Sequence, residues 1–361
     1  MITTTGAIAI ARDLALPQDA GFSPGETMEY KRLGRSGIDV STVCLGTMMF
    51  GGPTPEREAL EIIAHARDNG VNFIDTADVY EKGESERITG AAVAGARDHW
   101  VVATKVANAT NPKVKNNGGL SRRWVLAACD ASLARMNLDH IDIYYLHYDD
   151  TSTPLDETVG ALGDLMRAGK IRYFGVSNFR GWRIAEVVRA CERNSVARPV
   201  VCQPYYNLLN RMPEVEILPA CDHYGLGVAP YSPIARGVLT GKYRKGSEAP
   251  PDSRGARKDV RMMETEFREE SFEIAEKLHK HAQATGRTAT QFALAWLWSN
   301  KIITSVIAGP RTLAQWKDYV AAVGTSWSDE DDAFVDSLVR PGHPSTPGYT
   351  DPRYPFFGRR R

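Results

Sequence analysis

The chain has 361 residues, 43% of them hydrophobic, and its 44 Lys and Arg residues balance its 44 Asp and Glu residues to a net charge of zero. This length and apolar content suffice for one large core, and the balanced charge excludes a nucleic acid or a membrane surface held by bulk electrostatic attraction. No apolar run approaches the ~18 residues of a membrane helix, and residues 1–27 lack the pattern of a signal peptide, so we expect a cytoplasmic protein.

The chain has five cysteines, an odd number, and no two of them form a Cys-x-x-Cys pair. Zinc ligation and dithiol redox chemistry use closely spaced pairs, so this spacing argues against both. We expect buried, reduced thiols and no metal site. The five are Cys44, Cys129, Cys191, Cys202 and Cys221.

In chain order, residues 1–27 show no sustained hydrophobic period, and we expect a poorly ordered extension there. A hairpin follows, with its turn at residues 35–37, and from residue 42 short apolar runs alternate with amphipathic stretches. Strands are predicted near residues 42–46, 71–75, 100–105, 141–146, 171–176, 199–203, 226–230 and 303–307. Helices are predicted near residues 55–69, 84–95, 121–137, 156–168, 181–193, 213–224, 268–285 and 312–322.

This alternation of eight strands and eight helices predicts a (β/α)8 barrel over residues 28–340, with the hairpin as a plug at its bottom. The first strand is not followed by Gly-x-Gly-x-x-Gly, which argues against a Rossmann fold. The basic stretch Tyr243–Arg261 follows the seventh strand and is either a mobile lid or a solvated surface loop. The Pro-rich tail, residues 341–361, is predicted to be non-helical and either covers the barrel mouth or forms a surface strap.

Three successive predicted strands end in an ionisable residue. The first ends in Asp75, with Tyr80 five residues later, the second ends in Lys105, and the third is followed by His147. The carboxyl ends of barrel strands form one face, where active sites are built. Taken singly, each residue also has a purely structural interpretation. Asp75 is then a helix cap and Tyr80 an aromatic residue of the core or surface. Lys105 is then a member of a structural ion pair, and His147 a hydrogen-bonded core histidine. All four at successive strand ends favour a catalytic site.

This set of residues, in this order, resembles the tetrad of the aldo-keto reductases. The resemblance covers about residues 28–340, and the run Ala235-Arg236-Gly237 is similar to the bacterial and potassium-channel β-subunit branch of that family. It implies an NADP(H)-dependent enzyme that reversibly reduces aldehydes or ketones, with NAD(H) as a possible cofactor. The same branch leaves open a non-catalytic, nucleotide-binding regulatory subunit. A Schiff-base aldolase that uses Lys105 is a further alternative.

Carbonyl reduction needs a proton donor beside the hydride donor, and Tyr80 is the candidate. A free phenol has a pKa near ~10, and a nearby ammonium lowers it, so Lys105 is expected to tune Tyr80. Asp75 is expected to hold Lys105, and His147 to orient the substrate oxygen.

The resemblance also implies the cofactor contacts. Ser177, Asn178 and Gln203 match residues that hydrogen-bond the nicotinamide carboxamide, and Tyr231 matches the tyrosine that stacks on the ring. The run Arg236–Lys242 resembles a pyrophosphate clamp. The full predicted set is Gly46, Thr47, Met48, Asp75, Ser177, Asn178, Gln203, Tyr231, Ser232, Ile234, Arg236, Gly237, Lys242, Gly309, Arg311 and Gln315.

The segment Ala308–Gln315 resembles the one that binds the adenosine 2′-phosphate at a helix start. Gly309 and Gln315 stand where many members have Lys and Arg, so Arg311 is the only cation of this segment. NADP(H) remains the favoured cofactor. For a small carbonyl or alcohol substrate, we expect a mostly apolar pocket and leave the oligomeric state open. Its predicted lining is Met48, Phe50, Tyr80, His147 and Tyr148.

Overall fold

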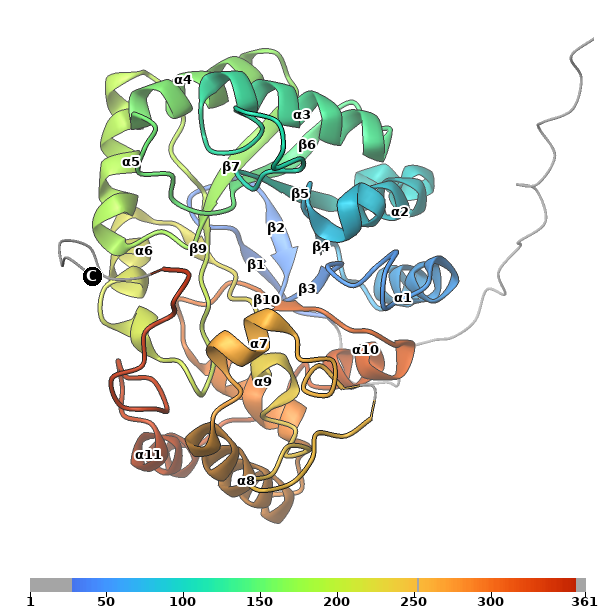
Figure 1. Cartoon of the computed structure of the whole chain (residues 1–361), viewed down its shortest axis with the longest axis vertical. Coiled ribbons are helices and arrows are strands. Elements are labelled where there is room, and N and C mark those ends of the chain that lie inside the picture. Colours follow the sequence, from blue (N-terminus) through green and yellow to red (C-terminus); the bar gives the residue numbers. More distant parts are fainter. Residues whose placement is uncertain (1–27, 252, 355–361) are drawn as a thin grey trace, which may run out of the picture.

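The computed structural model describes residues 28–251 and 253–354 (Figure 1). The predicted extension, residues 1–27, and the end of the tail, residues 355–361, lie outside the described residues. Within them, eight parallel strands form one sheet in the order β10-β3-β4-β5-β6-β7-β8-β9. Parallel bridges from Val228 to Ile303 and from Tyr231 to Ile307 close this sheet on itself. The strands are β3 (Val43–Gly46), β4 (Phe73–Asp75), β5 (Val101–Val106), β6 (Ile141–Leu146), β7 (Ile171–Ser177), β8 (Val201–Gln203), β9 (Gly227–Val228) and β10 (Val306–Ala308).

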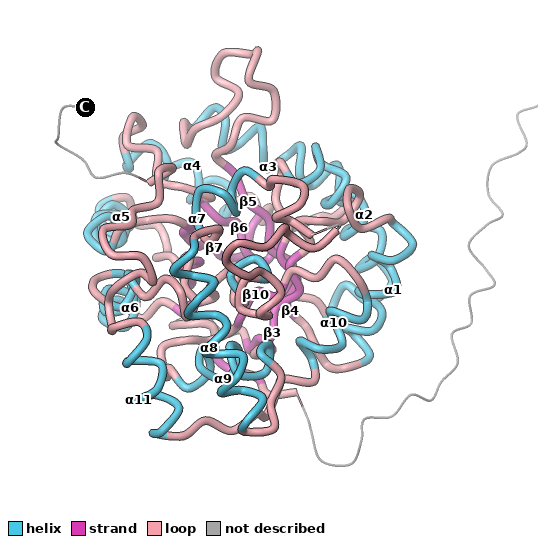
Figure 2. Tube along the Cα trace, turned by 60° about the horizontal axis from the view of Figure 1, so that its bottom comes forward, coloured by secondary structure: helices cyan, strands magenta, loops and turns pink. Residues whose placement is uncertain are grey.

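The helices surround this closed sheet, which confirms the predicted (β/α)8 barrel (Figure 2). They are α1 (Glu56–Asp68), α2 (Glu84–Val93), α3 (Arg122–Met136), α4 (Leu155–Arg167), α5 (Gly181–Arg193), α6 (Ile217–Tyr224), α7 (Val260–Thr265), α8 (Glu269–Ala284), α9 (Ala289–Ser299), α10 (Leu313–Val320) and α11 (Asp329–Leu338). Among the described residues, no helix is both long and apolar enough to cross a membrane.

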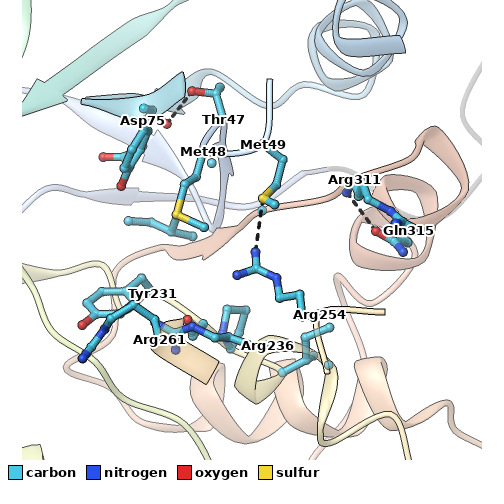
Figure 3. Close-up of a pocket in the computed structure, with 18 of the residues that line it drawn as sticks. Thr47, Met48, Met49, Asp75, Tyr231, Arg236, Arg254, Arg261, Arg311 and Gln315 are labelled. Carbon is cyan, nitrogen blue, oxygen red and sulfur yellow. Dashed lines mark hydrogen bonds between the residues drawn. The ribbon is translucent and has the colours of Figure 1, made fainter. Parts of the chain in front are cut away.

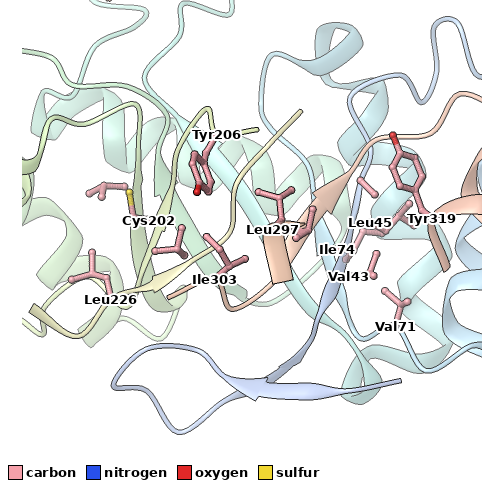
Figure 4. Close-up of a cluster of buried hydrophobic side chains, with 14 of the residues drawn as sticks. Val43, Leu45, Val71, Ile74, Cys202, Tyr206, Leu226, Leu297, Ile303 and Tyr319 are labelled. Atoms are coloured by element: carbon pink, nitrogen blue, oxygen red, sulfur yellow. The ribbon is translucent and has the colours of Figure 1, made fainter. Parts of the chain in front are cut away.

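Side chains along each strand alternate between two apolar layers, as the two-residue period of a strand requires. Val43 and Leu45 belong to the large core between strands and helices, part of which Figure 4 shows. Cys44, between them, belongs to the smaller cluster inside the barrel. Both layers are fully apolar at these positions, which explains why the strands appear in the sequence as short continuous hydrophobic runs.

The predicted hairpin plugs the barrel. Strands β1 (Tyr30–Arg32) and β2 (Asp39–Ser41) pair antiparallel. Leu33 and Val40 are fully buried and join the cluster inside the barrel. Gly34 has φ +54°, and a Cβ there would lie 2.4 Å from the carbonyl oxygen of Val200, so only glycine allows this close approach.

Helix α9 was not predicted, because its sequence shows no polar face. Residues 292–297 are all buried, so the usual helical period disappears. The capping box formed by Thr288 and Gln291 is the sequence feature that marks its start. The predicted helix over residues 213–224 is instead a 3₁₀ turn, Met212–Glu214, followed by α6. The short helices α7 and α11 were also not predicted.

Strand register decides where the chemical groups lie. Gly46 pairs with Asp75, so β3 and β4 end level, and Asp75 pairs with Ala103, beyond which β5 runs on through Lys105 to Val106. Lys105 pairs with Tyr145 on β6, two residues before His147. The groups predicted at strand ends therefore meet at one edge of the barrel.

Candidate active site

The structure brings Asp75, Tyr80, Lys105 and His147 together, and we call these four residues the tetrad. The Lys105 ammonium donates to Asp75 Oδ1 and, at 2.7 Å, to the carbonyl oxygen of Thr76. It also lies 3.2 Å from Tyr80 Oη. The rings of Tyr80 and His147 meet edge to face with 5.9 Å between centroids. A proton donor, a charged amine, a carboxylate and an imidazole therefore share one small volume.

Burial makes the pairing of Lys105 and Asp75 necessary. Their side chains are 0% and 3% exposed, and an unpaired charge at such depth is costly. Gln203 Nε2 donates to the second carboxylate oxygen at 2.9 Å, so both Asp75 oxygens have a partner. Burial alone would lower the pKa of Lys105, but Asp75 and Tyr80 more than offset it and the pKa is raised. The amine therefore stays charged.

The pKa of Tyr80 differs from the sequence-based expectation. Burial raises it, and this outweighs the lowering by Lys105, while the negative charge of Asp75 adds to the rise. The effect predicted for Lys105 is present, but the net shift of the pKa is upward because burial disfavours the charged phenolate more strongly. Tyr80 is therefore held in its protonated, proton-donating form at neutral pH.

His147 is held as a neutral imidazole. Burial is the main cause that lowers its pKa well below the usual value, and the charges of Lys105 and Arg353 lower it further. The amide nitrogen of Asn108 lies 3.0 Å from Nδ1, and an amide nitrogen only donates. Nδ1 is then the acceptor, which leaves the proton on Nε2 free to donate to an oxygen in the cavity.

A cavity of about 460 Å³ opens over the tetrad at the carboxyl ends of the strands. All sixteen predicted cofactor residues line it, as do the predicted pocket residues Met48, Tyr80 and His147. The other two predicted pocket residues, Phe50 and Tyr148, do not line this cavity. Phe50 is fully buried in the core, and the Tyr148 hydroxyl donates to the carbonyl oxygen of Ala107 at 3.0 Å. In both cases the loop after the strand turns the side chain away from the cavity.

The predicted carboxamide-binding groups form one network. Asn178 donates to the carbonyl oxygen of His147 at 2.8 Å and accepts from the Tyr231 hydroxyl at 2.9 Å. Ser177 Oγ donates to the carbonyl oxygen of Gln203 at 2.8 Å. Asn178 has φ +58°, a left-handed conformation that asparagine tolerates, which turns the chain at the end of β7. Amide and hydroxyl groups held this way suit a ligand that both donates and accepts hydrogen bonds.

Arg236 has a different electrostatic setting from the one expected of a phosphate clamp. It lines the cavity, but its guanidinium is only 9% exposed and pairs with the fully buried carboxylate of Glu266 at 2.7 Å. Its charge is therefore largely compensated within the protein. Sequence reasoning did not identify Glu266, because a lone glutamate 30 residues away carries no motif.

Four other cations line the far part of the cavity, and we call Lys242, Arg254, Arg257 and Arg311 the cationic rim. Figure 3 shows Arg254 reaching across toward Met49, with Arg311 at one end of the cavity and Asp75 at the other. The guanidinium of Arg254 lies 3.5 Å from Met49 Sδ. Partial burial and the charges of the three arginines lower the pKa of Lys242.

Sequence reasoning assigned Lys242 and Arg311 to the cofactor but left Arg254 and Arg257 in a basic loop of open role. The structure places part of that loop against the cavity, which is lined by Pro250, Pro251, Ser253, Arg254, Arg257 and Arg261. The Gln315 side chain accepts from the backbone N–H of Arg311 at 2.8 Å and so helps shape the turn before α10.

The structure gives less support to a Schiff-base lysine, a reactive cysteine or a metal site. Lys105 does not line the cavity, is fully buried and has a raised pKa, whereas a Schiff-base lysine must be reachable and neutral. All five cysteines are buried and free. Within the described parts of the chain, no cluster of His, Cys, Asp or Glu side chains is arranged to hold a metal ion.

Comparison with known proteins identifies the family of this chain. A model of the aldo/keto reductase family matches residues 42–340. A protein of Arabidopsis thaliana named probable voltage-gated potassium channel subunit beta is 37% identical over 303 residues, covering 82% of this chain and 91% of that protein. The Bacillus subtilis (strain 168) protein named uncharacterized oxidoreductase YrpG is 36% identical over 313 residues, covering 84% and 93%. The versiconal hemiacetal acetate reductase of Aspergillus parasiticus is 32% identical over 346 residues, covering 87% and 99%.

The chain therefore belongs to the aldo/keto reductase family, which confirms the resemblance seen in its motifs. The family and its oxidoreductase-named relatives support an oxidoreductase that acts on carbonyl compounds with a nicotinamide cofactor.

Proposed function

We propose that this protein transfers hydride between NADP(H) and a small aldehyde or ketone, reversibly, with Tyr80 as general acid and base. The bound nicotinamide would supply or accept the hydride, which no side chain can do. The observation that carries the proposal is the position of the Lys105 ammonium, 3.2 Å from Tyr80 Oη and paired with Asp75, directly beneath a cavity that Tyr80 lines.

In the direction of reduction, Tyr80 gives its phenolic proton to the carbonyl oxygen as hydride reaches the carbon. The phenolate that remains is stabilised by the Lys105 ammonium, whose charge Asp75 maintains. The Nε2–H of His147 holds the same oxygen in place, so the substrate needs little reorganisation before reaction. In alcohol oxidation the phenolate takes the proton back, by microscopic reversibility.

The cationic rim supports NADP(H) over NAD(H). Repulsion among its like charges contributes to the lowered pKa of Lys242, and a bound dianion relieves such repulsion. A 2′-phosphate supplies two negative charges that NAD(H) lacks. Gly309 and Gln315 replace the Lys and Arg that many family members have at these positions. In this chain, Arg254 and Arg257 supply the positive charge that these two residues do not.

The test is Tyr80→Phe, measured against wild type with NADPH and a panel of aromatic aldehydes. We expect turnover to fall by about 10²–10⁴-fold, because the proton donor is lost, while NADPH binding changes less than about twofold. The 7 Trp residues of the chain provide the fluorescence for the binding titration. Tyr224→Phe, at the end of α6 and outside the cavity lining, is the matched control. Substantial turnover by Tyr80→Phe would contradict the assignment.

A second candidate is a nucleotide-binding regulatory subunit, because several relatives bear the name of potassium channel β subunits. Tight NADPH binding with negligible turnover on every aldehyde and ketone tried would favour it. The complete tetrad favours the catalytic function instead.

A further inference from the structure

The tail places a cation at the tetrad end of the cavity. Arg353 and Tyr354 line the same cavity as Tyr80 and His147. Burial and the charge of Lys105 are the main causes that lower the pKa of His147, and the charge of Arg353 is near enough to lower it further. Arg353 also opposes the burial-driven rise in the pKa of Tyr148, the residue that follows His147. Arg353 is therefore a substrate-side cation, separate from the cationic rim.

The backbone on both sides of Arg353 is anchored. The Asp351 carboxylate accepts two hydrogen bonds from Arg261, at 2.6 Å and 3.0 Å. The carbonyl oxygen of Tyr354 accepts from Arg180 Nη2 at 2.8 Å. The Arg353 N–H donates to Asp351 Oδ1 at 2.9 Å, which closes a turn between the two anchors. The tail is thus held where it brings Arg353 to the cavity.

Further up the tail, two contacts fix its path. Pro344 bridges to Asn210, and the Arg268 guanidinium lies 3.9 Å from the centre of the Tyr349 ring. The whole described part of the tail, residues 341–354, therefore follows the barrel surface to the cavity without forming a helix.

Among the described residues, Arg353 has no carboxylate partner for its guanidinium, unlike its cationic neighbours. Arg261 pairs with Asp351 and Glu264, Arg236 pairs with Glu266, and Lys105 pairs with Asp75. Between residues 28 and 354, leaving out residue 252, no hydrogen bond or ion pair is made by the Arg353 guanidinium. Positive charge is therefore left over at the substrate end, beside a neutral His147.

We propose that Arg353 selects carbonyl substrates that carry a carboxylate group, by pairing with that carboxylate while the carbonyl oxygen meets Tyr80 and His147. This inference rests on the proposed function, whose substrate class it names. The planar guanidinium matches a carboxylate with two parallel hydrogen bonds. Arg353 is exposed but lines the cavity, and its positive charge attracts an anionic substrate, whereas a neutral analogue of the same shape gains no such attraction.

The experiment compares three carboxybenzaldehydes, substituted at positions 2, 3 and 4, with their methyl esters, using NADPH as reductant. Each pair shares the reacting aldehyde and differs in the negative charge, and the three isomers vary the distance from carbonyl to carboxylate. We expect wild type to prefer at least one acid over its ester in kcat/KM by about tenfold or more.

The variant Arg353→Met should abolish that preference by raising KM for the acid about tenfold, with kcat and the ester reaction nearly unchanged. Arg353→Lys should retain part of it, because the charge remains but the planar fork is lost. Arg172→Met, at an exposed arginine on β7 outside the cavity lining, is the matched control. A rise in KM for the acid without a fall in kcat distinguishes lost substrate pairing in Arg353→Met from a general loss of structure.

Each outcome decides the question. Equal kcat/KM for acid and ester at all three positions would overturn the inference and leave the proposed reductase intact. An acid preference that survives in Arg353→Met would also overturn it. Absence of turnover on every acid and ester, with NADPH still bound, would overturn both the inference and the proposed function.

Discussion

The tetrad and the cationic rim lie in one cavity but are built on opposite principles. In the tetrad, every charge is buried and compensated, as the pairing of Lys105 with Asp75 shows. In the cationic rim, Lys242 and Arg257 are exposed, and like charges lie near one another. The tetrad is therefore preorganised without a ligand, whereas the rim gathers positive charges whose mutual repulsion a bound anion would reduce.

The two regions also come from different parts of the barrel. The carboxyl-terminal parts of the strands and the residues that follow them supply the tetrad, and strand register sets its geometry. The rim is assembled from the loop before α7 and the turn before α10. We infer that the strands carry the reaction and the loops carry the choice of ligand, a division known for barrels of this type.

The largest expected effect follows from Lys105→Met. Turnover should fall by about 10²–10⁴-fold, because the phenolate of Tyr80 loses its stabilising charge. The unfolding free energy should fall by about 3–5 kcal/mol, because Asp75 stays buried without its partner. Steady-state assays and urea unfolding measure the two effects.

The control for that variant is Lys170→Met, which removes an ion pair to Asp130 at 2.6 Å whose side chains are about half exposed. Surface pairs contribute little, so activity and stability should both stay close to wild type. If Lys105→Met and Lys170→Met destabilised the protein equally, the distinction between a buried, compensated tetrad and an exposed periphery would fail.

A smaller, ligand-specific effect is expected from Arg254→Gln in the rim. The dissociation constant of NADPH should rise about tenfold, and that of NADH by less than about twofold, because only NADPH carries the 2′-phosphate. Parallel fluorescence titrations measure both. Arg244→Gln, on the same loop but outside the cavity lining, should change neither.

The NADPH effect should also shrink at high ionic strength, since exposed charges are screened there. An equal loss of affinity for NADH and NADPH would mean that Arg254 contacts a part shared by both nucleotides, and would remove the argument that the rim selects NADP(H).

The smallest effect concerns Asp78, a buried carboxyl between Asp75 and Tyr80 in the sequence. Among the described residues, neither of its carboxyl oxygens has a hydrogen-bond partner. Burial, together with the nearby Glu86, raises its pKa to about 8, although Arg135 and Lys105 oppose the rise. The folded protein thus binds this proton more tightly than the unfolded chain, whose Asp pKa is ~3.9.

A raised pKa in the folded state means stability that is fully present below the unfolded pKa and is lost as pH rises through the folded pKa. Asp78 should therefore destabilise the wild type progressively from about pH 4 to about pH 8. Asp78→Asn cannot ionise, so its advantage in Tm over wild type should grow by a few degrees across this window and then level off. Thermal melts at pH 5 to 9 test this, with the exposed Asp222→Asn as control. A pH-independent difference would contradict the shifted pKa.

Much of the barrel was predictable from local sequence patterns. The strands β6 and β7 lie within one residue of the predicted ranges, because short, mostly apolar runs bounded by polar residues mark buried parallel strands. The tetrad followed from the predicted strands that correspond to β4, β5 and β6, since each of them ends in, or is followed by, an ionisable residue. Helix α9 was missed for the converse reason: a helix buried on every side has no polar face to reveal its period.

The amino-acid sequence by itself determined the barrel, the tetrad and the family, because these depend on hydrophobic period and on residues at the ends of neighbouring strands. Only the tertiary structure decided which side chains reach the cavity. Phe50 turns into the core, Arg236 is neutralised by Glu266, and Arg353 arrives from the far end of the chain. The loops that line the cavity come together through long-range contacts, and such contacts produce no hydrophobic periodicity in the sequence. The pKa of Tyr80 depends on burial, which only the folded chain provides.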